Sequence, residues 1–198
     1  AEVHAGLSGK ILSVAADGST STLLGGFPSY AGPTETTGIY RVIPHGDSIW
    51  VLMSGTATAT TGAFWLGPMV ELDAANFAVK NIVNLQGFEM ANDPDGNGFD
   101  SNPGDIAFAP DGTMYLLDTG GNSLLLWSEE AGLQVVQAWP DNPVPTSLEI
   151  AENGDFYVGF LGAGLAPGAG KIEHWANGEL VETFGGLTTV TDILLDGD

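Results

Sequence analysis

The stretch GDIAFAPDGTMYLLD, residues 104–118, indicates the fold because it recurs. It aligns without gaps to TSLEIAENGDFYVGF, residues 146–160, which begins 42 residues further along the chain. Each copy reads as an apolar strand, a tight turn with glycine and a second apolar strand. The stretch TDILLDGD, residues 191–198, begins a third copy and stops at the turn. Such a repeat is typical of a protein built from several copies of one small unit.

The second half of the unit repeats as well. GKIEHWANGELVETF, residues 170–184, resembles GKILSVAADGSTSTLL, residues 9–24. Each full unit therefore has four antiparallel strands, as a β-propeller blade does. The sequence predicts an all-β fold in which residues 1–198 form one β-propeller domain or a propeller fragment. We place complete blades at about 38–85, 104–139 and 146–184, and partial blades at 9–24 and 190–198.

The partial blades can be completed in two ways. They could pair with each other and close a small ring, or the chain could be part of a six- or seven-bladed ring. We favour the larger ring, because the chain stops just before the strand that its own repeat predicts next. Open blade edges would then offer unpaired strands to another chain, including a second copy of this one.

The chain is strongly acidic. It has 4 Lys and Arg against 25 Asp and Glu, a net charge of -21. This charge argues against nucleic acid and anionic membrane surfaces as partners, because their phosphates would be repelled. It suits cations, and it equally suits solubility in a salty environment. The chain has no cysteine, so a disulfide framework and a thiolate metal site are both excluded.

The predicted connections between strands differ in length at the two ends of a blade. Short turns such as PDG, residues 110–112, lie at one end, where the first strand meets the second and the third meets the fourth. The connections at the other end are long, at residues 56–68, 87–103 and 161–170. Long connections usually carry function, so that end is the functional candidate.

One long connection contains the acidic stretch NDPDGNGFDSNPGD, residues 92–105. Asp93, Asp95 and Asn97, followed by Gly98, match the first half of an EF-hand loop. In such a loop alternate oxygen ligands converge on a hard cation and the glycine permits a sharp turn. The sequence therefore suggests a site for Ca²⁺.

The second half of an EF-hand is absent from this stretch. Gly104 stands where the bidentate glutamate would be, and we predict no flanking helix. Asp100 or Asp105 would have to complete an irregular oxygen shell. The alternative is a turn-rich loop whose Asp and Asn side chains cap their own backbone.

A second candidate site is the pair Phe64 and Trp65 in the connection 56–68. Two adjacent aromatic side chains could stack on a ligand or dock a partner protein. The alternative is that they fold back and pack over the neighbouring blade.

The motifs resemble a known family. PGDIAFAPDGTMYLLDTGGNSLLLW, residues 103–127, resembles an NHL-type propeller repeat. Together with AWPDNPVPTSLEI, residues 138–150, and FYVGFLGAGLAPGAGKI, residues 156–172, it is similar to the ScyD/ScyE family of secreted NHL-like β-propeller proteins. This resemblance implies an exported protein, extracellular or periplasmic, with no firmly assigned catalytic chemistry. The small-residue start of the chain is compatible with a leader that has been removed. Trp127 stands where the family has a basic residue, so the resemblance supports fold and export more than a pathway.

These observations favour a non-catalytic binding or scaffold protein with an unidentified protein or small-molecule ligand, no membrane insertion and Ca²⁺ as its candidate cofactor. One alternative is a structural extracellular protein that self-assembles through its blade edges. Another is a calcium-dependent, lactonase-like hydrolase, in which Asp105, Glu149 and Asp192 converge from equivalent strands on the propeller axis. The sequence has no nucleophile elbow to support a serine hydrolase.

Overall fold

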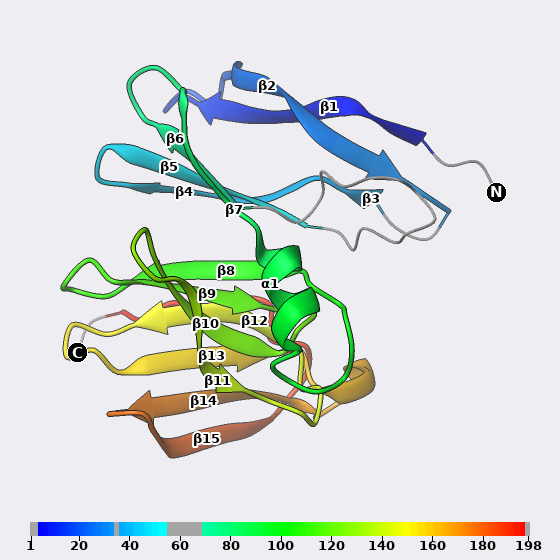
Figure 1. The fold of residues 1–198 in the computed structure, drawn as a ribbon, viewed down its shortest axis with the longest axis vertical. Coiled ribbons are helices and arrows are strands. Elements are labelled where there is room, and N and C mark those ends of the chain that lie inside the picture. The colour runs from blue at the N-terminus through cyan, green and yellow to red at the C-terminus, as the bar shows by residue number, and fades with distance from the viewer. Residues whose placement is uncertain (1–3, 34–35, 55–68, 197–198) are drawn as a thin grey trace. The chain divides into compact units, whose positions relative to one another are not determined.

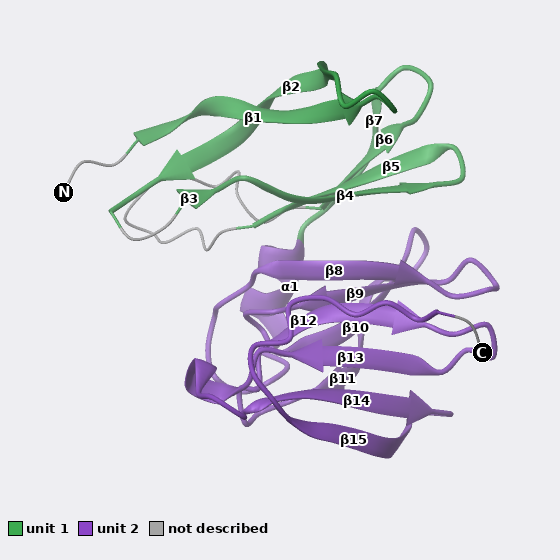
Figure 2. Cartoon of the chain, turned by 180° about the vertical axis from the view of Figure 1, so that it is seen from behind, with its two compact units in different colours: residues 1–84 green, residues 85–198 purple. Residues whose placement is uncertain are grey.

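The computed structural model describes residues 4–33, 36–54 and 69–196. The chain divides into two compact units, residues 1–84 and 85–198 (Figure 2). Each unit contains two antiparallel sheets. None of the helices in the described ranges has the length and apolar character of a membrane span.

Unit 1 begins with a three-stranded sheet and continues with a four-stranded one, each in sequence order. The strands are β1 (His4–Val14), β2 (Thr20–Ala31), β3 (Thr36–Thr37), β4 (Ile39–His45), β5 (Ser48–Met53), β6 (Met69–Asp73) and β7 (Val79–Val83). Ile11 from the first sheet packs with Val51, Met53, Val70 and Leu72 from the second to form the core of this unit. The sheet β4–β7 falls within the blade predicted at 38–85.

Unit 2 consists of a short helix and two four-stranded sheets (Figure 1). Its elements are α1 (Leu85–Asn92), β8 (Pro103–Phe108), β9 (Met114–Asp118), β10 (Ser123–Ser128), β11 (Gly132–Ala138), β12 (Pro145–Ile150), β13 (Phe156–Phe160), η1 (Ala163–Leu165), β14 (Gly170–Ala176) and β15 (Glu179–Leu187). The two sheets run from Pro103 to Ala138 and from Pro145 to Leu187, close to the blades predicted at 104–139 and 146–184. The predicted all-β architecture of four-stranded antiparallel blades is therefore confirmed.

The repeat is visible in the backbone as well as in the sequence. The first strand of each four-stranded sheet has a register shift next to its first residue, between Ile39 and Arg41, between Pro103 and Asp105, and between Pro145 and Ser147. A bulge of this kind bends a strand and re-aims its side chains. All three four-stranded sheets therefore have the same irregularity at the start of their first strand.

The two sheets of unit 2 are joined by an apolar core and one buried carboxylate. The core contains Trp139 and Phe160, whose ring centroids are 5.1 Å apart in an edge-to-face arrangement. Asp105 is 4% exposed, and its Oδ2 accepts a hydrogen bond of 3.0 Å from the backbone N–H of Leu148 in the next sheet. A strand of one blade is thus fixed to the first strand of the next.

The structure differs from prediction at the segment 190–195, which we expected to be a strand. Residues 188–196 belong to no strand, although Val190 accepts a hydrogen bond of 2.7 Å from Thr146 Oγ1. Asp192 Oδ1 accepts a hydrogen bond from the N–H of Ile193, as Asp105 Oδ1 does from Ile106. The local contact is repeated, but a strand requires a paired neighbour, and no described segment pairs with this one.

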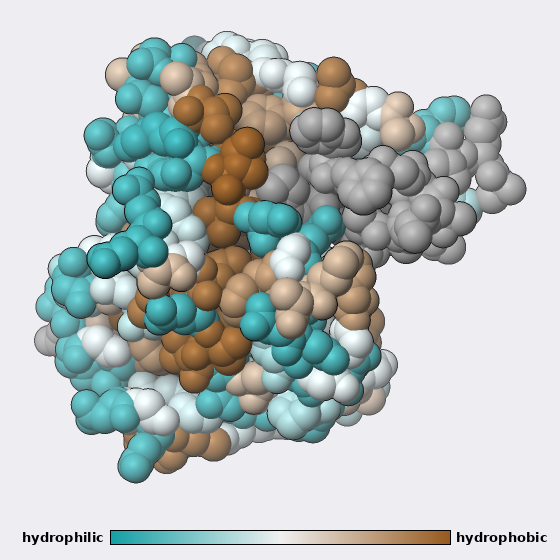
Figure 3. All heavy atoms as spheres, viewed as in Figure 1, coloured by the Kyte–Doolittle hydropathy of each residue, from teal (hydrophilic) through white to brown (hydrophobic). Residues whose placement is uncertain are grey.

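Hydrophobic side chains also reach the surface of the molecule (Figure 3). The outermost strand of unit 2, β15, is exposed along its whole length. Val181 is 58% exposed and Leu180 48%. A free strand edge with apolar side chains is a surface on which another strand can pair.

Candidate cation site

The long connections of unit 2 gather at one end of its strands. Because every strand is antiparallel to the next, the long connections 93–102, 139–144 and 161–169 and the short turn 119–122 all lie at the end where α1 is found (Figure 1). The turns at the other end are short. The sequence predicts that the long connections lie together at one end of the blades, and in unit 2 they do.

The helix α1 was not predicted, since we expected residues 87–103 to be a loop without flanking helices. Leu85 and Glu89 are one helical turn apart and both are buried, with exposed fractions of 0% and 1%. A glutamate at an inward position interrupts the apolar periodicity by which helices are recognised. Asp93 ends the helix in a left-handed conformation, with φ of 42°, and its N–H donates to the carbonyl of Glu89.

The carboxylate of Glu89 is the unusual feature of this helix. Among the described residues neither Oε1 nor Oε2 has a hydrogen-bond partner, although both atoms are buried. A buried carboxylate without a donor or a counter-charge is costly. The cost of burying the Glu89 carboxylate must therefore be offset by a proton or by a bound cation.

Two aspartates of the following loop face this side chain. Ligand oxygens of Glu89, Asp93 and Asp95 all lie within 4.8 Å of one another, and we call these three residues the carboxylate cluster. Within the described ranges they are the one such group of three or more acidic, histidine or cysteine side chains. The spacing suits a hard cation, which Ca²⁺ sites hold with oxygens at about 2.3–2.6 Å.

The loop holds the aspartates in place from outside the cluster. Asp93 Oδ1 accepts a hydrogen bond of 3.1 Å from the N–H of Gly98. Asp95 is 5% exposed and accepts hydrogen bonds of 2.9 Å from the N–H of Asn97 and from Asn122 Nδ2. The cluster is thus open to solvent only on the side of Asp93, which is exposed.

The electrostatic potential at the cluster is strongly negative. Burial raises the pKa of Glu89 to about 7, with further contributions from the charges of Asp118, Asp95, Asp93 and Asp100. Burial raises the pKa of Asp118 as well, and the pKa of Asp100 is raised by burial and then by the charge of Asp95. The negative end of the α1 dipole adds to this potential, because Glu89 and Asp93 stand at the helix C-terminus.

Within the described part of unit 2, no basic side chain pairs with the cluster. Lys171 is the single Lys or Arg in residues 85–198, and its Nζ pairs with Glu173 at 2.7 Å. His174 pairs with Asp155 at 2.8 Å. The negative charge of the carboxylate cluster could therefore be offset by a cation bound from solution.

The structure brings together some of the predicted ligands and adds one. Asp93 and Asp95 belong to the cluster, whereas the predicted ligand Asp100 is not one of the three residues whose ligand oxygens lie within 4.8 Å of one another. Asn97 supports Asp95, since its Nδ2 donates to Asp95 Oδ2 at 3.0 Å. Glu89 was missed, and the signal that could have found it is its position four residues before Asp93, one turn back if the preceding residues are helical.

The other predicted sites do not form a centre in the described structure. Asp105, Glu149 and Asp192 do not form a group with ligand atoms within metal-binding reach, and Asp105 is bonded to the backbone of the next blade. Phe64 and Trp65 lie outside the described residues.

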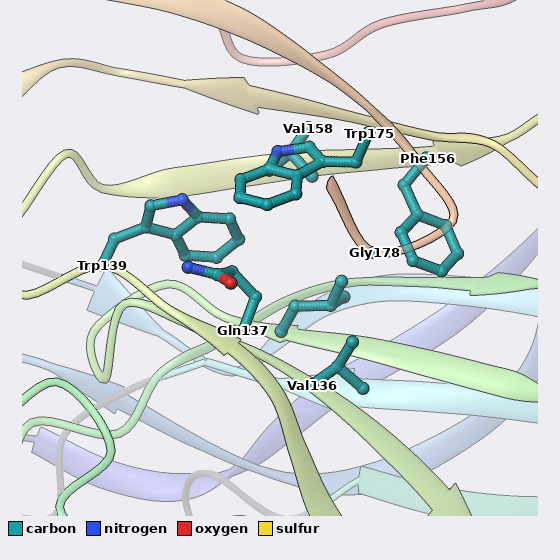
Figure 4. Close-up of a pocket in the computed structure, with 8 residues that line it drawn as sticks. Val136, Gln137, Trp139, Phe156, Val158, Trp175 and Gly178 are labelled. Carbon is teal, nitrogen blue, oxygen red and sulfur yellow. The ribbon is translucent and has the colours of Figure 1, made fainter. Parts of the chain in front are cut away.

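An apolar pocket lies between the two sheets of unit 2 (Figure 4). Trp139 and Trp175 line it, and both indole N–H groups donate to Glu173 Oε2, at 3.1 and 3.0 Å. With these donors occupied, the pocket offers apolar surface and the amide of Gln137. It is continuous with the packing core of the unit.

The comparison with solved structures bears on the fold. A luciferin-regenerating enzyme superposes with a TM-score of 0.52 at 15% identity over 93% of this chain and 56% of its own. A gluconolactonase from Xanthomonas campestris superposes with a TM-score of 0.50 at 14% identity over 92% of this chain and 71% of its own. The chain has a β-propeller-like fold.

At these identities the likeness shows the fold alone. A virginiamycin B lyase from Staphylococcus aureus is also similar, at 10% identity and a TM-score of 0.49, over 93% of this chain. The chain spans 59% of the length of that lyase. No protein family matches the sequence, and no curated protein does.

Proposed function

We propose that this β-propeller-like protein is a non-catalytic binding protein whose carboxylate cluster holds a hard divalent cation, Ca²⁺ by preference. The observation that carries the proposal is Glu89. The residue is 1% exposed, neither carboxylate oxygen has a hydrogen-bond partner among the described residues, and the carboxylate lies within reach of two others. A bound cation would replace the missing donors and offset the charge of all three groups.

The donor set favours calcium over other metals. It consists of carboxylate oxygens without histidine or cysteine, which disfavours zinc and copper. Mg²⁺ demands near-ideal octahedral geometry, whereas Ca²⁺ accepts irregular shells of six to eight oxygens. An irregular group on a helix end and a loop, completed by water at the side of Asp93, suits the larger ion.

The cation has a structural part in this proposal. It would tie α1 to the connection that leads into β8, at the end of the blades where the long connections gather. A ligand or partner would bind at that end, because long connections usually carry function. We extend the proposal to secretion, because that family is exported and extracellular fluids contain enough calcium to fill sites of moderate affinity.

Isothermal titration of chelator-treated protein with CaCl₂ and MgCl₂ tests the site. We expect heat of binding and a higher unfolding temperature with Ca²⁺, and a weaker response to Mg²⁺. Glu89→Gln keeps the shape and removes the charge, so its Ca²⁺ affinity should fall at least about tenfold, within the range for lost metal-site groups.

The control is Glu152→Gln, which makes the same change at an exposed turn at the other end of unit 2 and should bind as wild type does. Absence of both heat and a thermal shift at millimolar Ca²⁺ would contradict the proposal. So would a Glu89→Gln variant that binds as tightly as wild type.

A further inference from the structure

Asn122 connects the carboxylate cluster to a connection that lies far from it in the sequence. It is 2% exposed, and its Nδ2 donates to Asp95 Oδ2 at 2.9 Å and to Asn142 Oδ1 at 3.1 Å. Its Oδ1 accepts a hydrogen bond of 3.0 Å from the N–H of Val144. One side chain thus contacts both the cluster and the connection 139–144.

The backbone of Asn122 adds to these links. Its carbonyl accepts a hydrogen bond of 2.9 Å from the N–H of Trp139, at the start of that connection. A second bridge runs beside it, since Asn97 Nδ2 donates to Asp95 Oδ2 and to the carbonyl of Pro140, at 3.0 and 3.2 Å. Asp95 is therefore the point where the cluster meets two amide side chains that hold residues 139–144.

The connection 139–144 is held in a strained conformation. Asn142 and Val144 both have positive φ, of 51° and 63°, and a β-branched residue rarely adopts the left-handed region. Such a conformation persists only where surrounding contacts enforce it. The hydrogen bond from Val144 to Asn122 is one of those contacts, and the position of Asn122 depends on Asp95.

We propose that Asn122 transmits occupancy of the cation site to the connection 139–144, so that cation binding orders this segment between the two blades of unit 2. The inference rests on the proposed cation site. Without the cation, repulsion among Glu89, Asp93 and Asp95 loosens Asp95 and weakens its hold on Asn122. With the cation bound, Asp95 is fixed from both sides and the connection is fixed with it.

Hydrogen exchange measured by mass spectrometry, with and without Ca²⁺, tests this coupling. In wild type, Ca²⁺ should slow exchange at least about tenfold both in residues 93–98 and in residues 139–145, as expected when local opening is suppressed. Residues 176–180, at the other end of the unit, should exchange alike in both conditions and act as an internal control.

Asn122→Gly separates coupling from binding. Glycine accepts the positive φ of 41° at this position and removes all side-chain links. Because Asn122 also supports Asp95, the variant is measured at a Ca²⁺ concentration that titration shows to saturate it. There Ca²⁺ should still slow exchange in residues 93–98 but change residues 139–145 less than about twofold. The matched control, Asn177→Gly, changes another left-handed asparagine, with φ of 52°, and should respond as wild type does.

The outcomes distinguish this inference from the proposal on which it rests. If titration detects no Ca²⁺ binding to wild type, the cation site and the coupling both fail. If Ca²⁺ binds but residues 139–145 of wild type exchange at an unchanged rate, the coupling alone is wrong. This comparison uses wild-type protein alone, so it tests the coupling even if Asn122→Gly does not fold. Full retention of the effect in folded Asn122→Gly would also overturn the role of Asn122.

Discussion

Glu89 combines burial, negative charge and the lack of a hydrogen-bond donor in one side chain. It lies one helical turn after Leu85, which is also buried, and residues four apart share a helix face, so its side chain points into the unit rather than to solvent. In the absence of a cation this carboxylate is a source of instability. That cost has a defined dependence on pH.

The first prediction concerns Glu89→Gln in cation-free protein. The pKa of Glu89 rises from 4.5 in the unfolded chain to about 7 in the folded protein. Between these values the folded state keeps a proton that the unfolded state has lost, so the contribution of Glu89 to stability falls as pH rises through this window. The variant should be more stable than wild type by about 1–3 kcal/mol at pH 8 and by much less at pH 5.

Urea denaturation in the presence of a chelator measures this difference at each pH. Comparing the two proteins at equal pH removes the contributions of the other carboxylates. A difference in unfolding free energy that is the same at pH 5 and pH 8 would show that the folded state does not raise the pKa of Glu89.

The second prediction concerns a variant that displaces Glu89 sterically and leaves its charge unchanged. A Cβ added at Gly121 would lie 2.7 Å from Glu89 Oε2, so Gly121→Ala must displace the carboxylate. Its Ca²⁺ affinity should fall at least about tenfold by titration calorimetry. Gly185→Ala is the matched control, because a Cβ there meets no atom within 4 Å. Equal affinity in the two variants would argue against Glu89 as a ligand.

At the scale of elements, the blades of unit 2 are joined through the first strand of each. Asp105 in β8 reaches the backbone of β12, and the bulge next to it directs the side chain there. A carboxylate can accept from two N–H groups at once, and Asp105 does so with Ile106 and Leu148. Its role is therefore structural, and this explains why it does not join the carboxylate cluster.

The third prediction follows from that geometry. Asp105→Asn replaces one acceptor oxygen by an NH₂ donor that would face a backbone N–H, so the unfolding free energy should fall by about 1–3 kcal/mol. Thermal or urea denaturation measures the loss. Asp141→Asn, at an exposed position, should leave stability within about 0.5 kcal/mol. A loss no larger in Asp105→Asn than in this control would show that the contact between blades contributes little.

For the whole molecule, the exposed outer strand of unit 2 predicts self-association. Among the described strands β15 is an edge strand, paired only with β14. It carries Leu180 and Val181 at its surface, and such an edge can pair with a second copy. We expect light scattering to give a mass above 20.4 kDa that falls toward the monomer in Val181→Lys. Leu194→Lys, which changes a residue that is 83% exposed and outside any strand, should not alter the mass. A wild-type monomer at high concentration would contradict the prediction.

The architecture was accessible from the sequence because a propeller is a local repeat. Alternation of apolar residues, glycine turns and a repeat of 42 residues specify four-stranded meanders in which neighbouring strands pair. The same reasoning sorted the connections by end and pointed to Asp93 and Asp95. It did not produce α1, because two helical turns with a glycine and an inward glutamate carry no apolar period. It also predicted a strand at 190–195. A strand forms only where a neighbouring segment pairs with it, and the local sequence pattern does not contain that information.

The character of the site depends on contacts between distant residues, which no local pattern contains. Whether Glu89 is solvated or buried, whether a donor reaches it, and whether Asn122 meets Asp95 are set by the way α1, the β9–β10 turn and the connection 139–144 pack together. The acidic composition alone is explained as well by solubility in a salty environment as by calcium binding. Burial separates them, because a carboxylate is inexpensive in water and requires a counter-charge when water is excluded.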